Sequence, residues 1–507
     1  MNLPDAGTPE PDDVSRVVGR WKSLDAPFAN ALESGVHLPL ALARLGVQLC
    51  ARGNDADACE VLNVARSLQP NDGAIAINLA VVLERLDQTD EAIRHARRSV
   101  AIAPSEADSW IFLGNLNRKQ RDLRGAAAAY ESAIALNANA PLAWQGLGFV
   151  KKDLGKPAEA LDCFITSIRQ SGATAPLLSI LGQLFYQTGQ FEKSRDAYAA
   201  AVEFDGANAV YRKMLRETSF ISAAISGDPI DDALQVYQTD AAAHPATEDK
   251  TVPELLGSVF ALLSAYGHIN GARNVGQYRV ERFPDSAEAA YLLSAISGEA
   301  SAARAPDAYL VEHFDAFATQ FDEQLVKNLD YDVPEQLGFM LAALLPSDSR
   351  VNILDAGCGT GLCGPWVRGM AATLTGVDLS QGMLNQAQRR GIYDRLACEE
   401  LTAFLQNSPG AYDIVIAADV MIYFGDLTDL AAAIANALKR GGLLAFSIER
   451  SSARNHQLLT SGRFAHNPGY VRSVLGVDFI EVRSEQTTVR LEALKPVAGD
   501  VFVFRRR

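Results

Sequence analysis

The sequence predicts an all-α array of repeated helix pairs followed by a doubly wound α/β domain with a mainly parallel sheet. Three observations support this fold class. A small residue recurs every 34 positions in the N-terminal half, a predicted strand runs into a glycine-rich turn after residue 355, and two later predicted strands each end in an acidic residue. The length of 507 residues implies at least two hydrophobic cores, and the composition, with 48% hydrophobic and 21% charged residues, is typical of globular proteins.

The recurring small residue marks the place where the two helices of a pair would cross. Each instance is preceded by a leucine, and the series is Gly46, Ala80, Gly114, Gly148 and Gly182. A period of 34 residues is that of the tetratricopeptide repeat, in which small side chains allow the two helices to pack closely. The pattern weakens near Ala233 and Ala272, as expected for the repeats at the end of an array.

These patterns divide the chain into four predicted parts. Residues 1–37 form a polar tail and a leading helix, and residues 38–298 form the tetratricopeptide-repeat solenoid. Residues 299–305 form a linker, and residues 306–507 form the α/β domain. Because stacked helix pairs present an extended groove that suits a peptide, we expect a protein or peptide partner on the repeats.

The glycine-rich turn has the features of a cofactor-binding turn. A strand ending near Asp355 runs into the glycines of 357–361, which allow a tight turn and a close approach of the backbone to a ligand. A second strand ends at Asp378, at the spacing typical of an acid that binds ribose hydroxyls, and a third strand, residues 412–418, leads to Asp419. Three acids around one turn favour a ligand with a positive amine and a sulfonium and no phosphate. The sequence therefore predicts S-adenosyl-L-methionine as cofactor.

A nicotinamide dinucleotide is the alternative ligand, because residues 359–364 also satisfy the dinucleotide-binding pattern. A pyrophosphate prefers a helix N-terminus without nearby carboxylates, whereas Asp355 and Asp419 would add negative charge there. The acids therefore favour S-adenosylmethionine.

The motifs around this turn resemble those of a known family. The stretch from Leu354 to Gly361, the acid Asp378 and the strand from Asp413 to Asp419 resemble the motifs of class I S-adenosylmethionine-dependent methyltransferases. More narrowly, the chain is similar to bacterial predicted methyltransferases that contain tetratricopeptide repeats. It shares with that group Phe314-Asp315, Phe321-Asp322-Glu323, Asp330-Tyr331, Ile392-Tyr393-Asp394, and Arg463-Phe464-Ala465-His466 followed by Tyr470. The resemblance implies methyl transfer to an acceptor, and it implies that residues 313–322 form a lid over the cofactor.

Individual cofactor contacts follow from these motifs. Asp378 is expected to bind both ribose hydroxyls, and Asp355 to lie near the methionine amine. The resemblance implies that Glu400 accepts the adenine amino group. The full set of expected cofactor residues is Asp355, Gly357, Cys358, Gly359, Gly361, Asp378, Leu379, Met383, Glu400 and Asp419.

Three residues are candidates for catalysis on the acceptor side: Tyr423, His466 and Tyr470. His466 is a candidate general base or only a helix cap, and Tyr423 could simply form a wall of the pocket. A base is not essential, because holding the reactants in line contributes about 7–11 kcal/mol, whereas a base typically adds about 10²–10⁴-fold. Three possibilities stay open: a protein acceptor held by the repeats, a small metabolite with repeats that serve assembly, or a non-catalytic cofactor-binding scaffold.

Charge and cysteine usage limit the partners and the compartment. The net charge of −15 argues against broad binding to nucleic acid or anionic lipid. The six cysteines lack CxxC or metal-ligand spacing, so we expect no metal site and reduced thiols in a cytoplasm. The first 13 residues do not resemble a secretion signal, and no apolar stretch reaches the roughly 20 residues that a bilayer requires. We therefore expect a cytoplasmic protein without a nucleic-acid or membrane partner.

Overall fold

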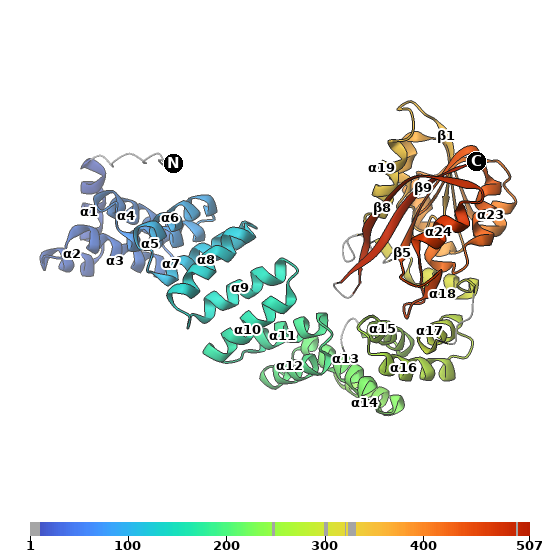
Figure 1. The fold of residues 1–507 in the computed structure, drawn as a ribbon. Coiled ribbons are helices and arrows are strands. Elements are labelled where there is room, and N and C mark those ends of the chain that lie inside the picture. The colour runs from blue at the N-terminus through green and yellow to red at the C-terminus, as the bar shows by residue number, and fades with distance from the viewer. Residues whose placement is uncertain (1–10, 246–248, 299–302, 320, 323–330, 493–494) are drawn as a thin grey trace. The chain divides into compact units, whose positions relative to one another are not determined.

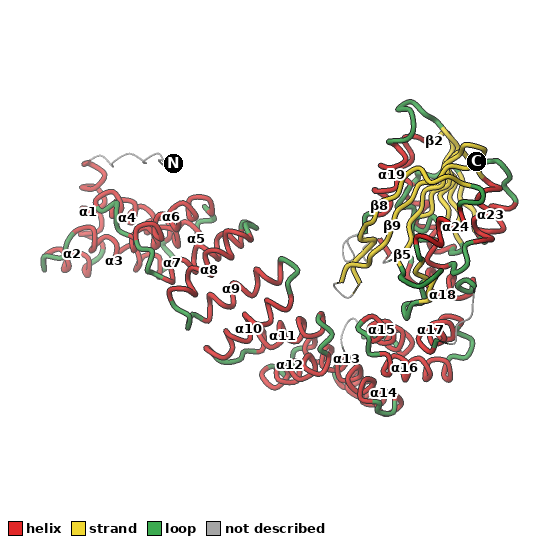
Figure 2. Tube along the Cα trace, in the orientation of Figure 1, coloured by secondary structure: helices red, strands yellow, loops and turns green. Residues whose placement is uncertain are grey.

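The computed structural model describes residues 11–245, 249–298, 303–319, 321–322, 331–492 and 495–507. They belong to two compact units that divide within the repeats: the first runs to Thr188 and includes Asp196–Ala207, and the second includes Gly189–Arg195 and continues from Asn208. Helices alone form the N-terminal part, and the strands of the described residues all follow residue 350 (Figures 1 and 2). This order confirms the predicted fold class.

The first unit consists of paired helices. Their bounds are α1 (Pro11–Leu24), α2 (Ala26–Glu33), α3 (Leu38–Ala51), α4 (Asp55–Leu68), α5 (Gly73–Arg85), α6 (Thr89–Ile102), α7 (Ala107–Lys119), α8 (Leu123–Leu136), α9 (Pro141–Asp153), α10 (Pro157–Ser171), α11 (Ala175–Gln187) and α12 (Phe191–Phe204), the last shared with the second unit. A Cβ added at Gly46 would lie 2.5 Å from Cγ of Leu62, and one at Gly114 would lie 2.6 Å from Cε1 of Tyr130. Helix packing therefore explains the recurring small residues.

The described part of the second unit continues with helices α13 to α18. They are α13 (Ala209–Ser226), α14 (Ile230–Ala243), α15 (Val252–Ala265), α16 (Ile269–Arg282), α17 (Ala287–Ser297) and α18 (Asp307–Phe317). A capping box of Thr251 and Glu254 begins α15, and Gly298, with a φ of 72°, ends α17 in the left-handed conformation that favours glycine. Of the predicted linker, residues 299–302 lie outside the described residues.

The strands of the second unit form one mixed sheet. Their bounds are β1 (Val351–Ala356), β2 (Ala371–Asp378), β3 (Arg395–Cys398), β4 (Tyr412–Ala417), β5 (Leu438–Arg450), β6 (His456–Leu458), β7 (Phe464–His466), β8 (Phe479–Glu492) and β9 (Lys495–Arg506). The order is β3-β2-β1-β4-β5-β7-β6, and β9 pairs with both β5 and β8. The first five strands in this order are parallel, as predicted, whereas β8 and β9 form a long antiparallel pair.

Two apolar cores cover the two faces of the sheet. The helices of this domain are α19 (Val333–Ala342), α20 (Gly364–Val367), α21 (Gln381–Arg390), α22 (Leu401–Gln406), α23 (Thr428–Ala437) and α24 (Pro468–Leu475). Ile353 of β1 packs in the core with α19 and α20, and its neighbour Leu354 packs in the core with α22, α23 and α24. Successive side chains of a buried strand point to opposite faces of the sheet. Helices therefore cover both faces, which is the doubly wound arrangement.

The strand order places a ligand crevice between β1 and β4. The chain proceeds from β1 toward β3 on one side and from β4 toward β5 on the other, so the order reverses at this point. Ligands of open α/β sheets bind outside the carboxyl ends of the strands at such a reversal. The turn after β1 and Asp419 after β4 both lie at this edge.

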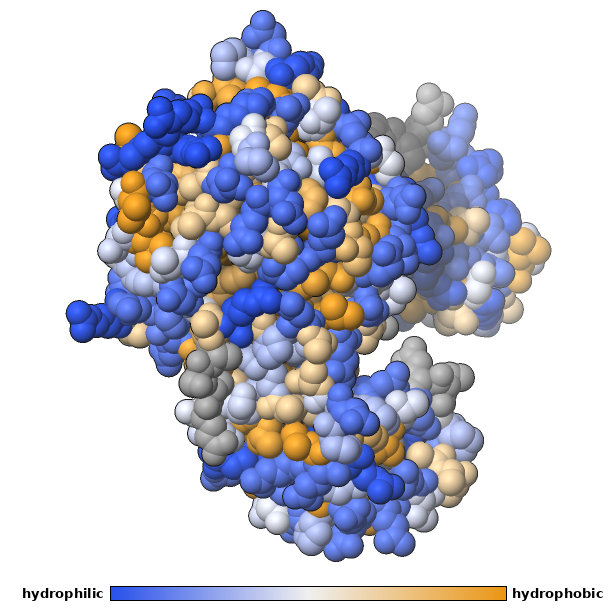
Figure 3. All heavy atoms as spheres, turned by 90° about the vertical axis from the view of Figure 1, so that its right-hand side faces the viewer, coloured by the Kyte–Doolittle hydropathy of each residue, from blue (hydrophilic) through white to orange (hydrophobic). Residues whose placement is uncertain are grey.

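The surface of the described residues is mixed in character. Figure 3 shows hydrophilic residues over most of the visible face, with hydrophobic residues interspersed. None of the helices in the described ranges combines the length and apolar character needed to cross a bilayer.

Candidate cofactor site

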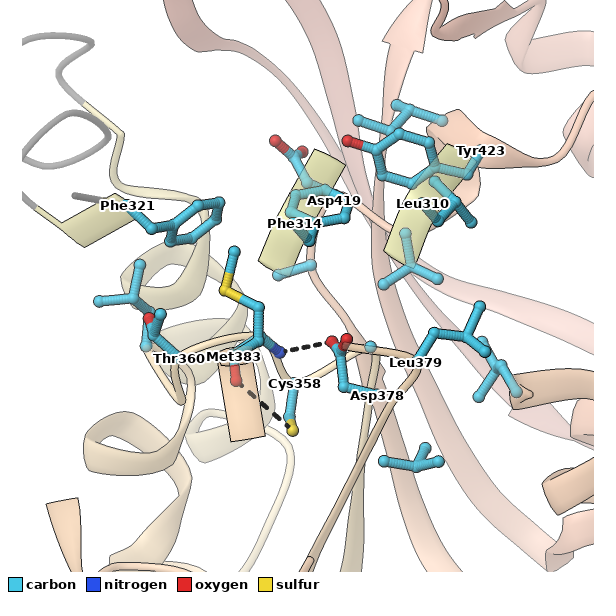
Figure 4. Close-up of a pocket in the computed structure, with 18 of the residues that line it drawn as sticks. Leu310, Phe314, Phe321, Cys358, Thr360, Asp378, Leu379, Met383, Asp419 and Tyr423 are labelled. Carbon is cyan, nitrogen blue, oxygen red and sulfur yellow. Dashed lines mark hydrogen bonds between the residues drawn. The ribbon is translucent and has the colours of Figure 1, made fainter. Parts of the chain in front are cut away.

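A cavity of about 320 Å³ opens at the carboxyl ends of β1, β2 and β4. Its floor comes from the turn after β1, including Cys358 and Thr360, and from Asp378 and Leu379 after β2 (Figure 4). Burial raises the pKa of the Cys358 thiol well above its usual value. The cavity thus forms where the strand order predicts a ligand crevice.

The turn after β1 requires glycine at two lining positions. Gly357 and Gly359 have φ values of 66° and 52°, which side chains other than glycine seldom adopt. A Cβ at Gly357 would lie 2.6 Å from Cγ2 of Val420, whereas one at Gly359 would meet no atom within 4 Å. Gly359 therefore borders open space, as a turn that approaches a ligand should.

Asp378 is fixed by backbone hydrogen bonds. The N–H of Gly359 donates to Oδ2 at 2.8 Å, and the N–H of Ser380 donates to Oδ1 at 2.9 Å. Burial raises the pKa of Asp378, while these N–H groups lower it. A carboxylate accepts more than one hydrogen bond per oxygen, so these contacts orient it and leave acceptor capacity for a ligand.

Asp419 has a left-handed backbone conformation, with a φ of 54°. Its N–H donates to Oγ of Ser447 at 2.9 Å, and that hydroxyl donates back to Oδ1 at 3.0 Å. Nη1 of Arg490 donates to Oδ2 at 3.3 Å, and Arg490 also pairs with Glu449. Burial raises the pKa of Asp419, and Arg490 opposes that change. Arg490, which lines the cavity, and Glu449 are both almost fully buried, and together they hold Asp419 in place.

Most predicted cofactor residues line this cavity. Those found in its wall are Gly357, Cys358, Gly359, Asp378, Leu379, Met383, Glu400 and Asp419. Glu400 is already engaged, because its Oε1 accepts from Arg304 at 2.7 Å and its Oε2 accepts from the Ala403 N–H at 2.8 Å at the start of α22. Sequence analysis did not identify Arg304, which has no motif around it.

Asp355 and Gly361 lie behind the turn and not in the cavity wall. Asp355 is 1% exposed, and the hydroxyl of Tyr393 donates to its Oδ2 at 2.5 Å. Burial raises the pKa of Asp355 to about 7. A Cβ at Gly361 would lie 2.8 Å from Cε2 of Tyr393. Both residues pack against Tyr393 outside the described cavity wall, and their contacts with a ligand stay predictions.

The three candidate catalytic residues separate into two groups. Tyr423 lines the cavity, and burial raises its pKa to about 12. His466 is fully buried in β7, where its Nε2 bonds the Phe424 carbonyl at 2.8 Å and burial lowers its pKa to about 4. The Tyr470 hydroxyl accepts from the Leu427 N–H at 3.0 Å. His466 and Tyr470 therefore hold the loop after Tyr423, and neither reaches the cavity as a general base would.

Aromatic side chains cover the cavity from α18. Phe314 (Figure 4) meets Tyr423 edge to face, with ring centroids 5.7 Å apart. Phe317 packs against Phe321 at the same centroid distance. Oδ1 of Asp315 accepts from the Ser380 hydroxyl at 2.6 Å and thereby ties α18 to the segment that follows β2. The segment predicted as a lid, 313–322, thus lies against the cavity, although residue 320 is outside the described residues.

Family models match both regions of the chain. Residues 354–444 match the model described as a methyltransferase domain, and residues 175–208 match the tetratricopeptide repeat. The chain carries a methyltransferase domain and tetratricopeptide repeats. The matched part of the methyltransferase domain runs from β1 to β5 and includes the glycine turn, Asp378 and Asp419.

Individual relatives match the methyltransferase domain only in part. The ubiquinone biosynthesis O-methyltransferase of Thiobacillus denitrificans is 29% identical over 118 residues, which are 22% of this chain and 50% of that protein. The enzyme of the same name from Bordetella pertussis is 31% identical over 146 residues, 27% of this chain and 59% of that protein. The chain thus spans about half the length of the curated relatives it matches. A solved magnesium protoporphyrin IX methyltransferase from Synechocystis with bound SAH is 19% identical, with a TM-score of 0.28, over 34% of this chain and 81% of that one.

Proposed function

We propose that the protein is an S-adenosylmethionine-dependent methyltransferase and that its repeats recruit a protein substrate or partner. The observation that carries the enzymatic part is the arrangement of Asp378 and Asp419 beside the glycine turn in one aromatic-covered cavity. The match of residues 354–444 to a methyltransferase domain supports the same conclusion.

The charges of the cavity favour a ligand with positive groups over one with a pyrophosphate. Each arginine of the wall is already paired with a carboxylate: Arg304 with Glu400 at 2.7 Å, Arg463 with Glu449 at 2.9 Å, and Arg490 with Asp419 at 3.3 Å. Carboxylates and aromatic rings attract a cation in a partly dry site. This arrangement supports S-adenosylmethionine over the dinucleotide alternative.

The wall residues have distinct roles in this proposal. Asp378 binds the ribose hydroxyls, the Gly357–Gly359 backbone faces the methionine part, and Leu379 and Met383 pack against the adenine. When bound, S-adenosylmethionine supplies an electrophilic methyl group. The aromatic cover of Phe314 and Tyr423 excludes water and restricts the approach of the acceptor.

No protein base is required for the transfer. Asp378, the Gly357–Gly359 backbone, Leu379 and Met383 would hold the cofactor, which would supply its methyl group to a lone pair of the acceptor while sulfur kept the electron pair of the broken bond. Any proton of the acceptor leaves to solvent. Because positioning contributes more than a base does, Tyr423 serves as a wall and His466 as a structural residue.

Calorimetry on the full chain tests which cofactor the protein binds. We expect S-adenosylmethionine and S-adenosylhomocysteine to bind and NAD not to bind. Hydrogen bonds to a charged group contribute about 1.5–3 kcal/mol, so Asp378→Ala should weaken binding at least about tenfold. The exposed Asp478→Ala serves as the matched control and should leave affinity unchanged. Tighter binding of NAD than of S-adenosylmethionine would contradict the proposal.

The role of the repeats rests on the tetratricopeptide match and on the groove that stacked helix pairs form. The alternative is a small-molecule methyltransferase whose repeats serve assembly, and the relatives named for ubiquinone biosynthesis favour it. Incubating a cell lysate with the protein and methyl-labelled cofactor separates the two. Label in macromolecules supports a recruited protein substrate, and label in small solutes supports the alternative.

A further inference from the structure

A second cavity lies beside the cofactor cavity, within the same compact unit. Its volume is about 790 Å³, within the range of roughly 300–1,000 Å³ that is usual for ligand pockets. One wall comes from α15, α16 and α17, the last helices before the methyltransferase domain, and the other from α18 and the loop between β6 and β7. No cofactor residue predicted from the sequence belongs to it.

The two cavities share one wall. The residues that line both are His313, Phe317, Tyr423 and Arg463. A molecule in the second cavity is therefore separated from the cofactor cavity only by side chains of this shared wall. A methyl acceptor must lie next to the methyl donor in this way for the transfer to occur.

Specific contacts hold α17 and the methyltransferase domain together, so the second cavity is a built feature. The hydroxyl of Tyr291 donates to the Gly462 carbonyl at 3.0 Å. A Cβ at Gly462 would lie 2.8 Å from Cδ2 of Leu292, and its φ of 78° also favours glycine. Glu288 of α17 bonds Nδ1 of His313 at 2.9 Å.

The charged groups of the second cavity are neutralised within the protein. Lys250 pairs with Glu217 at 3.1 Å, Arg279 with Glu288 at 2.7 Å, and Arg463 with Glu492 at 2.5 Å. Asp249 pairs with Arg216, and the carboxylate of Glu254 caps the start of α15. Among the described residues, the lining therefore presents no unpaired cation to an anion and no cluster of free carboxylates to a cation.

The rest of the lining is apolar with a few hydroxyl groups. Phe260, Leu292 and Phe317 provide apolar surface. Ser264 and Ser461 also belong to the lining, and among the described residues the hydroxyl of each is buried without a hydrogen-bond partner. A buried hydroxyl without a partner costs about 1–3 kcal/mol, which a hydrogen bond to a ligand would offset.

We propose that this second cavity is the acceptor site, assembled jointly by the last repeat helices and the methyltransferase domain, and that it takes a neutral, partly apolar small molecule with hydrogen-bonding groups. The inference rests on the proposed methyltransferase function and takes, for the acceptor, the small-molecule alternative named there. It makes α15–α17 part of the active site, while the earlier repeats stay available to a protein partner.

The test fills the cavity from the repeat side. Ala261 on α15 is exposed and lines the second cavity only, so Ala261→Trp should block the acceptor without touching the cofactor. Gln277→Trp on α16 is the matched control, because Gln277 is also exposed and lines neither cavity. Methyl-labelled cofactor and the full-length chain are incubated with the low-mass fraction and, separately, with the protein fraction of a lysate of the cells that make the protein. Cofactor affinity is measured by calorimetry on the same samples.

We expect the wild type to label neutral solutes of the low-mass fraction, Ala261→Trp to reduce that labelling at least about tenfold, and Gln277→Trp to match the wild type. Cofactor affinity should be equal in all three proteins. Full activity of Ala261→Trp overturns the inference, as does label confined to the protein fraction or absent from both fractions while the cofactor binds. Failure of the wild type to bind the cofactor at all would instead overturn the proposed function, and the inference with it.

Discussion

The repeats and the methyltransferase domain are held together by contacts of different range. In the repeats, the glycine and the side chain that packs on it are 16 positions apart in every case compared: Gly46 with Leu62, Gly114 with Tyr130, and Gly148 with Phe164. In the methyltransferase domain, Asp419 and Arg490 are 71 positions apart. This difference implies that a substitution in one repeat affects mainly that repeat and its neighbours, whereas the cofactor site depends on several strands at once.

The largest expected effect comes from Arg490→Met. The change removes the buried cation that pairs with both Asp419 and Glu449 and leaves Glu449 only its pair with Arg463. Removing one member of a buried pair costs about 3–5 kcal/mol. Hydrogen exchange should show this loss in the methyltransferase domain and not in α1–α10. Arg483→Met is the control on the same strand, because its surface pair with Glu485 is worth at most about 1 kcal/mol. Equal effects of the two variants would show that the buried pairs of Arg490 contribute no more to stability than a surface pair does.

His466 gives a pH-dependent effect of similar size. Its pKa is about 4 in the folded protein against a usual value of 6.5, so its contribution to stability is complete above pH 6.5 and is lost as the pH falls toward 4. At about 1.4 kcal/mol per pKa unit, the full loss is about 3 kcal/mol. In His466→Gln, the unfolding free energy measured by denaturant titration should depend less on pH in this window. Burial also lowers the pKa of His95 to about 4, so His95→Gln should act in the same direction in the repeats. Parallel pH profiles for wild type and His466→Gln would rule out this role.

A smaller and local effect is expected at Gly114. A Cβ there would overlap the Tyr130 ring, so Gly114→Ala should destabilise the repeats by about 1–3 kcal/mol. Gly19 is exposed in α1, and a Cβ there would have no atom within 4 Å. Gly19→Ala should therefore stabilise the folded repeats by up to about 1 kcal/mol. Thermal unfolding measures both variants. Changes of the same sign would show that helix propensity, and not packing, determines the glycine pattern.

The smallest effect is expected from removal of residues 1–207. Every residue in the wall of the cofactor cavity lies at or after Arg304, so the cofactor dissociation constant should change by no more than a few-fold. Calorimetry on the truncated and full chains makes this comparison. A loss of tenfold or more would mean that the repeats take part in cofactor binding.

Sequence reasoning located residues correctly where their position depends on immediate neighbours. The period of small residues follows from one helix pair, and Asp378, Leu379 and Asp419 lie in the cavity because strand ends of a parallel sheet meet at one edge. The spacing of motifs alone was enough to place them.

The same reasoning could not foresee contacts with residues that are distant in the sequence. Asp355 ends a strand as Asp378 does, yet Tyr393, 38 positions away, occupies its carboxylate. His466 bonds the Phe424 carbonyl 42 positions away, and no local pattern distinguishes such a buried histidine from a base. Arg304 and Arg490 also line the cavity, but neither belongs to a recognisable sequence motif, so the sequence did not predict them.

The backbone at Asp419 has a consequence for how this chain can evolve. A residue with a side chain held at a φ of 54° carries a conformational cost of about 1–3 kcal/mol, and glycine would remove it. Selection for stability alone would therefore drive this position toward glycine, and that same substitution would take away the carboxylate beside the cofactor cavity. The acid at position 419 therefore costs the fold stability that glycine would restore, and Asp419→Gly should give a chain that is more stable but lacks this carboxylate.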